Sequence, residues 1–274
     1  MEKMEFSGKQ RAEAMQYRWT KRADVWKTEA LVLILLTAFT FVINRHMEIK
    51  GLYMDDLYQW FCFNDNPFFA AVFTSGGTRF RALYNLAAWT EMKLFGTHVN
   101  WYVPFNIVLN SCLAYNLYRM AKRFSHSAYV GILCAVMFLM SRMSYYQIGQ
   151  ALGLMETMAL WMAILILWYL YRYLNEEGQQ RRYFIACGLY FGVCFVHERY
   201  MALIPLFLLV LLFKRTRKLW EWLAPAISFL AVQLIRTLTI GSVLPAGTGG
   251  TQVADTFSIS RSIRFALSQA AYVF

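Results

Sequence analysis

Along the whole chain, stretches without a charged residue alternate with short segments rich in lysine and arginine. Ala30 to Ile43 and Met201 to Phe213 are two of the uncharged stretches, and 58% of the 274 residues are hydrophobic. That fraction exceeds what a soluble domain of this length needs to fill one core. Because only helices and closed barrels satisfy their backbone groups in lipid, the pattern predicts an all-α, polytopic bundle of transmembrane helices.

Apolar content averaged over windows of about 19 residues predicts seven spans, with an eighth apolar stretch at the end of the sequence. The expected spans are Trp26–Asn44, Trp101–Tyr118, Tyr129–Met140, Leu154–Tyr171, Tyr183–Val196, Met201–Phe213 and Leu219–Ile235, and the eighth stretch begins at Ile263. One helix through the fifth and sixth spans would hold about 31 residues and overshoot a hydrocarbon core about 30 Å thick. We therefore expect two helices that meet at a polar turn, His197 to Tyr200.

The first 28 residues are polar and are expected to form a cytoplasmic segment, since they lack the apolar core of a cleaved signal peptide. Residues 29–274 then form the transmembrane domain. Its first outer loop, residues 45–100, is expected to contain two short amphipathic helices, around Asp56–Phe63 and Arg81–Leu94. Because the sequence stops within an apolar stretch, we expect the domain to be truncated at its C-terminus.

The basic residues indicate the orientation and explain the net charge of +11. With the N-terminus inside, most of the 27 lysines and arginines fall in the short inner segments, as the positive-inside rule requires. This distribution predicts a multi-pass protein with a cytoplasmic N-terminus, and we expect it in a bacterial inner or plasma membrane. A nucleic-acid partner is excluded, because no long polar segment carries a basic face. Eight of the 16 acidic residues then lie on or near the outer face: Glu48, Asp55, Asp56, Asp65, Glu91, Glu156, Glu198 and Asp255.

Two adjacent carboxylates, Asp55 and Asp56, lie in an aromatic-rich segment, Tyr53 to Trp60, shortly after the first span. Repulsion between adjacent like charges raises one pKa, which suits a general base that takes a proton from an attacking alcohol. The alternative is a solvated acidic turn that caps the following helix.

Metal and nucleotide motifs are not found. The five cysteines show neither a disulfide framework nor metal-ligand spacing, and His46, His98 and His126 occur singly. The glycine-rich run Gly247 to Gly250 is not followed by the lysine of a phosphate-binding loop. We therefore assign no metal ligand and no certain cofactor, and leave a divalent metal ion open.

Further motifs accompany the acidic pair. They are Thr78-Arg79-Phe80-Arg81-Ala82-Leu83, Leu94-Phe95-Gly96, Ser144-Tyr145-Tyr146-Gln147-Ile148-Gly149-Gln150 with Gly153-Leu154-Met155-Glu156, and His197-Glu198-Arg199. Together they resemble the polytopic GT-C glycosyltransferases across nearly the whole chain. That superfamily includes protein O-mannosyltransferase-like enzymes and bacterial lipid-linked-sugar transferases. The chain departs from the family pattern in having adjacent aspartates and an alanine, Ala82, in place of a proline.

The resemblance implies a glycosyltransferase that moves a sugar from a polyprenyl-phosphate donor to an acceptor hydroxyl, with inversion, on the extracytoplasmic face. The acceptor would be a glycan, a lipid or a protein, and membrane lipids would be further partners. The family's base carries over to Asp55 or Asp56. Arg79, Arg81 and Arg199 would hold the leaving phosphate, because guanidinium groups match phosphate oxygens. For the first two arginines, anchoring to lipid headgroups is the alternative.

Glu156, His197 and Glu198 complete the candidate substrate-binding residues, because charges at membrane depth usually face protein or a water-filled cavity. Glu198 has a structural alternative, which is an ion pair with a neighbouring arginine. Glu156 has another, which is a favourable interaction with the dipole of the helix that it begins.

Two other classes of function stay open: a transporter or flippase for a lipid-linked or polar solute, and a non-catalytic membrane subunit. A transporter often shows repeated halves and polar residues near the midplane of the membrane. This chain instead concentrates its charges at one membrane face and shows no repeat, which favours the transferase.

Overall fold

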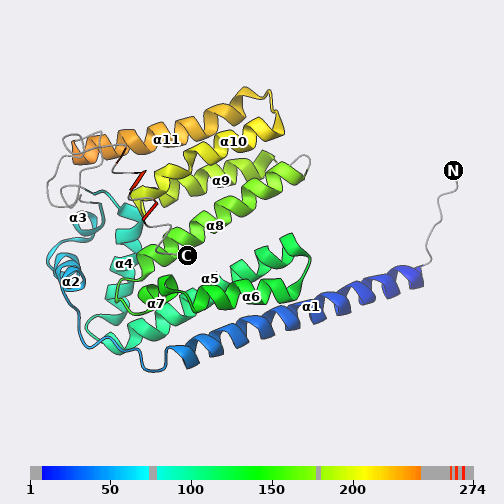
Figure 1. Cartoon of the computed structure of the whole chain (residues 1–274), viewed down its shortest axis with the longest axis horizontal. Helices are drawn as coiled ribbons and strands as arrows, with labels where there is room; N and C mark the ends of the chain where they lie inside the picture. The colour runs from blue at the N-terminus through cyan, green and yellow to red at the C-terminus, as the bar shows by residue number, and fades with distance from the viewer. Residues whose placement is uncertain are drawn as a thin grey trace. The chain divides into compact units, whose positions relative to one another are not determined.

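The computed structural model describes residues 8–73, 79–176 and 180–241, together with positions 260, 263, 264, 267 and 268. Regular structure in this part of the chain is helical throughout (Figure 1), which confirms the all-α class. Thr78, the glycine-rich run and most of the apolar stretch after Ile263 lie outside the described residues. The helices are α1 (Gly8–Ile43), α2 (Asp55–Asp65), α3 (Phe68–Phe73), α4 (Ala82–Phe95), η1 (Val99–Trp101), α5 (Tyr102–Ser125), α6 (Ala128–Leu139), α7 (Arg142–Ile148), α8 (Leu154–Asn175), α9 (Gln180–Val193), η2 (Glu198–Leu203), α10 (Ile204–Lys214) and α11 (Leu219–Ile240).

Among the described residues, three helical segments are long and apolar enough to cross a membrane: Trp26–Ile43 of α1, α8 and α11. A fourth is added if α6 and α7, which are bent by 57° at a short break, form one broken span. These segments indicate a membrane protein. The expected seven or eight spans are not confirmed, because α9 has 14 residues and α10 has 11, against the roughly 20 that a hydrocarbon core requires.

The chain divides into two compact units. The first contains residues 1–57 and 95–157, and the second contains residues 58–94 and 158–274. The amphipathic helices expected in the first loop are present as α2 and α4, with the short α3 between them.

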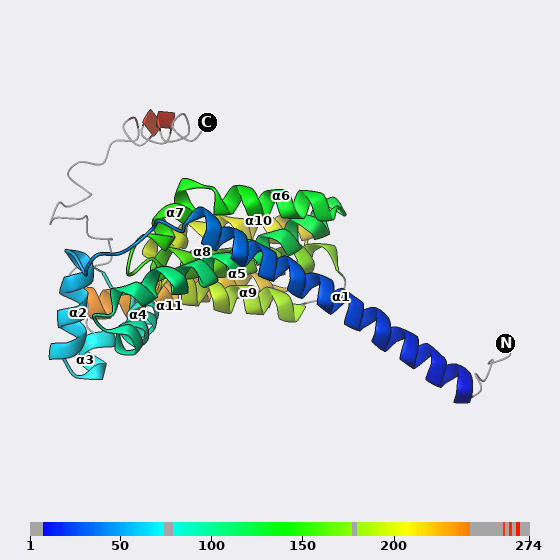
Figure 2. The ribbon, with the colours of Figure 1, turned by 90° about the horizontal axis from the view of Figure 1, so that it is seen from below.

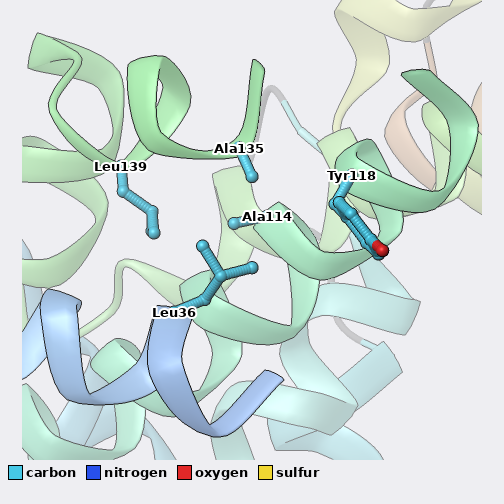
Figure 3. Close-up of a cluster of buried hydrophobic side chains, with 5 residues drawn as sticks. All are labelled: Leu36, Ala114, Tyr118, Ala135 and Leu139. Carbon is cyan, nitrogen blue, oxygen red and sulfur yellow. The ribbon is translucent and has the colours of Figure 1, made fainter. Parts of the chain in front are cut away.

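In the first unit, α1 lies along α5, and its N-terminal part continues beyond that helix (Figure 2). The contact among α1, α5 and α6 is closed by a cluster of buried side chains, Leu36, Ala114, Tyr118, Ala135 and Leu139 (Figure 3). A Cβ atom at Gly131 would lie 2.8 Å from the backbone oxygen of Tyr118. The absence of a side chain there therefore lets α6 approach α5 closely, as small residues do in helix pairs of membrane proteins.

Two asparagines of α5, Asn106 and Asn110, are buried in the first unit, where their side-chain N–H groups find acceptors. The side chain of Asn106 donates to the backbone oxygen of Gln150 at 2.8 Å, and that of Asn110 donates to the backbone oxygen of Asn106 at 3.0 Å. Ser111 donates to Thr40 of α1 at 3.2 Å. These bonds matter because an unpaired polar group in an apolar environment costs several kcal/mol.

The turn before α8 depends on a glycine. A Cβ atom at Gly153 would lie 1.8 Å from the backbone oxygen of Gln147, closer than any real contact. The carbonyl group of Gln147 is backbone and cannot swing away as a flexible side chain could.

Gly153→Ala is therefore expected to lower the stability of the chain, by about 1–3 kcal/mol if the turn can shift to relieve the overlap. Thermal unfolding of the detergent-solubilised protein measures this change. Gly51→Ala is the matched control, because a Cβ at Gly51 would meet nothing within 4 Å. Equal melting temperatures for the two variants would contradict the prediction.

In the second unit, α9, α10 and α11 pack together. Tyr190 and Phe207 are completely buried, with ring centroids 5.3 Å apart. The hydroxyl of Tyr190 donates to the backbone oxygen of Met201, which ties α9 to η2. Two helices joined by a polar turn, as expected for this region, are confirmed: α9 ends at Val193, η2 follows, and α10 begins at Ile204.

Candidate functional site

The segment Arg79-Phe80-Arg81, which has no regular secondary structure, directly precedes α4. Phe80 is buried and packs edge to face on Phe195, with ring centroids 5.8 Å apart. The backbone N–H of Tyr84 donates to the backbone oxygen of Phe195 at 3.3 Å. These contacts hold the segment on the end of α9, so that Arg79 and Arg81 both reach Glu198.

Glu198, the first residue of η2, is bound by Arg81 through two parallel hydrogen bonds. The Nε and Nη2 groups of Arg81 each donate to one carboxylate oxygen at 2.8 Å, and Arg79 Nε lies 3.7 Å from one of these oxygens. Burial opposes ionisation of this carboxyl group, but the hydrogen bonds from Arg81 outweigh it and lower the pKa of Glu198 to about 2. A carboxylate so firmly ionised is a poor proton acceptor, so its role is to position the arginines.

His197 is buried immediately before η2, and its Nδ1 atom accepts the backbone N–H of Arg199 at 3.3 Å. Burial, followed by the charges of Arg81 and Arg199, lowers the pKa of His197 to about 4. The ring is therefore neutral at ordinary pH, with its proton on Nε2. Among the described residues, three arginines and one glutamate gather around this turn, and they give the cluster an excess of basic side chains.

A cavity of about 480 Å³ opens beside this cluster in the second unit. It is lined by His197, Glu198, Arg199, Met201, Ala202, Phe229, Gln233 and Arg236. Arg236 was given no role by the sequence analysis. The signal for it was present, because Arg236 and Glu221 are the two charged residues within the apolar helix α11, and a charge in such a segment commonly marks a functional site.

Asp55 and Asp56 occupy the first turn of α2, after Met54, whose φ of 47° is left-handed. The side chain of Asp55 is exposed and that of Asp56 is half-buried. Burial first, and repulsion by Asp55 second, raise the pKa of Asp56, against a hydrogen bond from the backbone of Leu152 that lowers it. The raised pKa expected for one member of the pair therefore falls on Asp56, with desolvation as the larger cause.

The predicted site residues fall into two groups. Arg79, Arg81, Arg199, His197 and Glu198 come together in the second unit. In the first unit, Asp55 and Asp56 begin α2 and Glu156 lies partly exposed in the first turn of α8. Within the described part of the chain, no three histidine, cysteine or acidic side chains lie close enough together to hold a metal ion.

Comparison with known protein families, curated proteins and solved structures gives no match to this chain.

Arg81→Gln is expected to destabilise the chain far more than Arg79→Gln. The first change leaves the Glu198 carboxylate, whose side chain is 20% exposed, without its bidentate partner, and breaking a buried pair costs about 3–5 kcal/mol. The second removes a more distant cation that is 39% exposed, a type of contact worth about 1 kcal/mol or less. Thermal unfolding of both variants tests this order, and a larger loss for Arg79→Gln would disprove it.

The neutral state of His197 predicts a pH dependence of stability. Its pKa is about 4 in the folded chain against an ordinary 6.5, so between these values the unfolded chain binds the extra proton and stability falls as pH falls. Glu198 affects stability at lower pH. The stability that its ionised form contributes is lost as pH falls from its ordinary pKa of 4.5 toward 2. His197→Gln should flatten the change in melting temperature between pH 6.5 and 4. His98→Gln, at an exposed position, is the control, and its melting temperature should change with pH as that of the parent does.

Proposed function

We propose that this chain is a GT-C-type membrane glycosyltransferase, which moves a sugar from a polyprenyl-phosphate donor to an acceptor hydroxyl on the extracytoplasmic face with inversion. The observation that carries the proposal is the half-buried Asp56, with a raised pKa, in the helix that follows the first candidate span. The proposal includes the finer expectations of seven or eight spans, a cytoplasmic N-terminus and a bacterial inner membrane. The cluster of Arg79, Arg81 and Arg199 in the second unit supports the proposal, because it offers a place for a phosphate group.

In this reaction Asp56 takes the proton of the acceptor hydroxyl while the hydroxyl oxygen attacks the anomeric carbon of the sugar. The bond from that carbon to the phosphate oxygen breaks, and its electron pair leaves with the polyprenyl phosphate. Attack from the face opposite the leaving group inverts the anomeric centre. A phosphate is a stable leaving anion, so the reaction requires one base and cations that bind the phosphate, without a general acid.

The cations divide into two roles in this proposal. Arg81 is committed to Glu198 by two hydrogen bonds, which makes it a positioning residue. Arg199 is exposed and lines the cavity, and Arg79 is 39% exposed. Both of these side chains are accessible to a phosphate group.

The test uses membranes that contain the full chain, supplied with polyprenyl-phosphate sugars. Asp56→Asn should lower sugar transfer roughly 100-fold or more, the usual contribution of a general base. Asp55→Asn should have a smaller effect, because the exposed Asp55 raises the pKa of Asp56 only as a secondary cause. Expression level is the control for both variants.

Glu48→Gln is the matched control, because Glu48 is an exposed acid of the same loop that pairs with Lys50. It should transfer sugar as the parent does. Full sugar transfer by Asp56→Asn would show that Asp56 is not the base. The alternatives would then be a transporter, a flippase or a non-catalytic subunit.

A further inference from the structure

The cavity in the second unit has one wall from the turn before α10 and another from α11. On α11, Phe229, Gln233 and Arg236 are spaced by four and three positions, which places them on one face of the helix. All three line the cavity. The apolar helix therefore presents a cation to this space.

Arg236 is only 3% exposed, although its side chain carries a full charge. Its Nη1 group donates to the sulfur of Met201 at 3.5 Å, and its Nε group has no acceptor among the described residues. A thioether sulfur is a weak acceptor, and the described residues supply no carboxylate in an ion pair with this guanidinium group. Such a buried charge is strongly unfavourable unless an anion compensates it.

The carboxylate on the cavity wall does not neutralise Arg236. The Glu198 carboxylate is bound by Arg81 through two hydrogen bonds. Gln233 adds a buried amide oxygen that has no donor among the described residues. Arg236 is therefore the buried cation of this cavity, and Arg199 places a second guanidinium group on its wall, which suits an anionic ligand.

The rest of the lining is apolar and comes from Met201, Ala202 and Phe229. Guanidinium groups match the oxygens of a phosphate group, and apolar walls favour an attached hydrocarbon. The volume of about 480 Å³ is in the range of pockets that hold small ligands.

We propose that this cavity binds the phosphate group of an isoprenoid or other lipid phosphate, with Arg236 as its buried anchor and Arg199 as its second cation. Identification of this ligand with the sugar donor rests on the proposed function. The phosphate site itself is carried by the geometry of Arg236 and the cavity.

Binding of undecaprenyl phosphate without a sugar is measured by native mass spectrometry on the detergent-solubilised full chain. The parent should bind it, and Arg236→Met should bind it roughly 10- to 100-fold more weakly, the range expected for the loss of charge-assisted hydrogen bonds. Arg217→Met is the matched control, because it removes an exposed arginine outside the cavity. Equal binding by the parent and Arg236→Met, or no binding by the parent, would overturn the inference.

Melting temperature separates a ligand role from a structural role. If no anion neutralises the charge of Arg236 in the absence of ligand, Arg236→Met should melt at the same temperature as the parent or at a higher one. Undecaprenyl phosphate should raise the melting temperature of the parent but not that of Arg236→Met. A lower melting temperature with unchanged lipid binding would show a structural arginine and overturn the site. Arg199→Gln, at an exposed position, provides a second variant and should weaken binding several-fold.

Two competitors identify the source of the phosphate. Undecaprenol, which lacks the phosphate, should not displace undecaprenyl phosphate, and displacement by it would overturn a phosphate site. Displacement by millimolar inorganic phosphate would support the phosphate site and assign it to a soluble ligand. Because no sugar is transferred in these measurements, loss of phosphate binding in Arg236→Met supports the cavity even if the Asp56 experiment disproves the transferase.

Discussion

The paired hydrogen bonds between Arg81 and Glu198 join segments that are 117 positions apart in the sequence. They connect the segment before α4 to the turn between α9 and α10. The same carboxylate also lies 3.7 Å from Arg79, so one partly buried acid holds two arginines in place. The neutral His197 adds no further charge to the site, and its Nδ1 atom is already engaged by the backbone of Arg199.

Sequence patterns predicted the features that depend on neighbouring residues. The all-α class, the two amphipathic helices of the first loop and the break between α9 and α10 follow from local apolar runs and from the charged turn His197 to Tyr200. The pairing of Glu198 with a neighbouring arginine was among the alternatives weighed from sequence. Which arginine would do so could not be known, because it depends on Phe80 docking against Phe195.

Other features depend on three-dimensional packing and were not accessible from the sequence. One such feature is the number of membrane spans. α9 and α10 are apolar but short, and the apolar content of a sequence window does not fix the length of the helix that forms there. Adjacency alone suggested that repulsion between the two aspartates would raise a pKa, whereas burial of Asp56 is the larger cause. For Arg236 the sequence does show a charge within an apolar helix, but only the structure shows that this charge is buried at a cavity wall.

The close contact at Gly131 and the hydrogen-bonded asparagines bear on the order in which the first unit folds. α5 and α6 are joined by a short connection that includes His126 in a left-handed conformation. Without the residues that follow α7, Asn106 would lack the backbone acceptor that Gln150 provides. We therefore expect α5 to reach its final packing only after α6 and α7 have been made, so that the three helices fold as one piece.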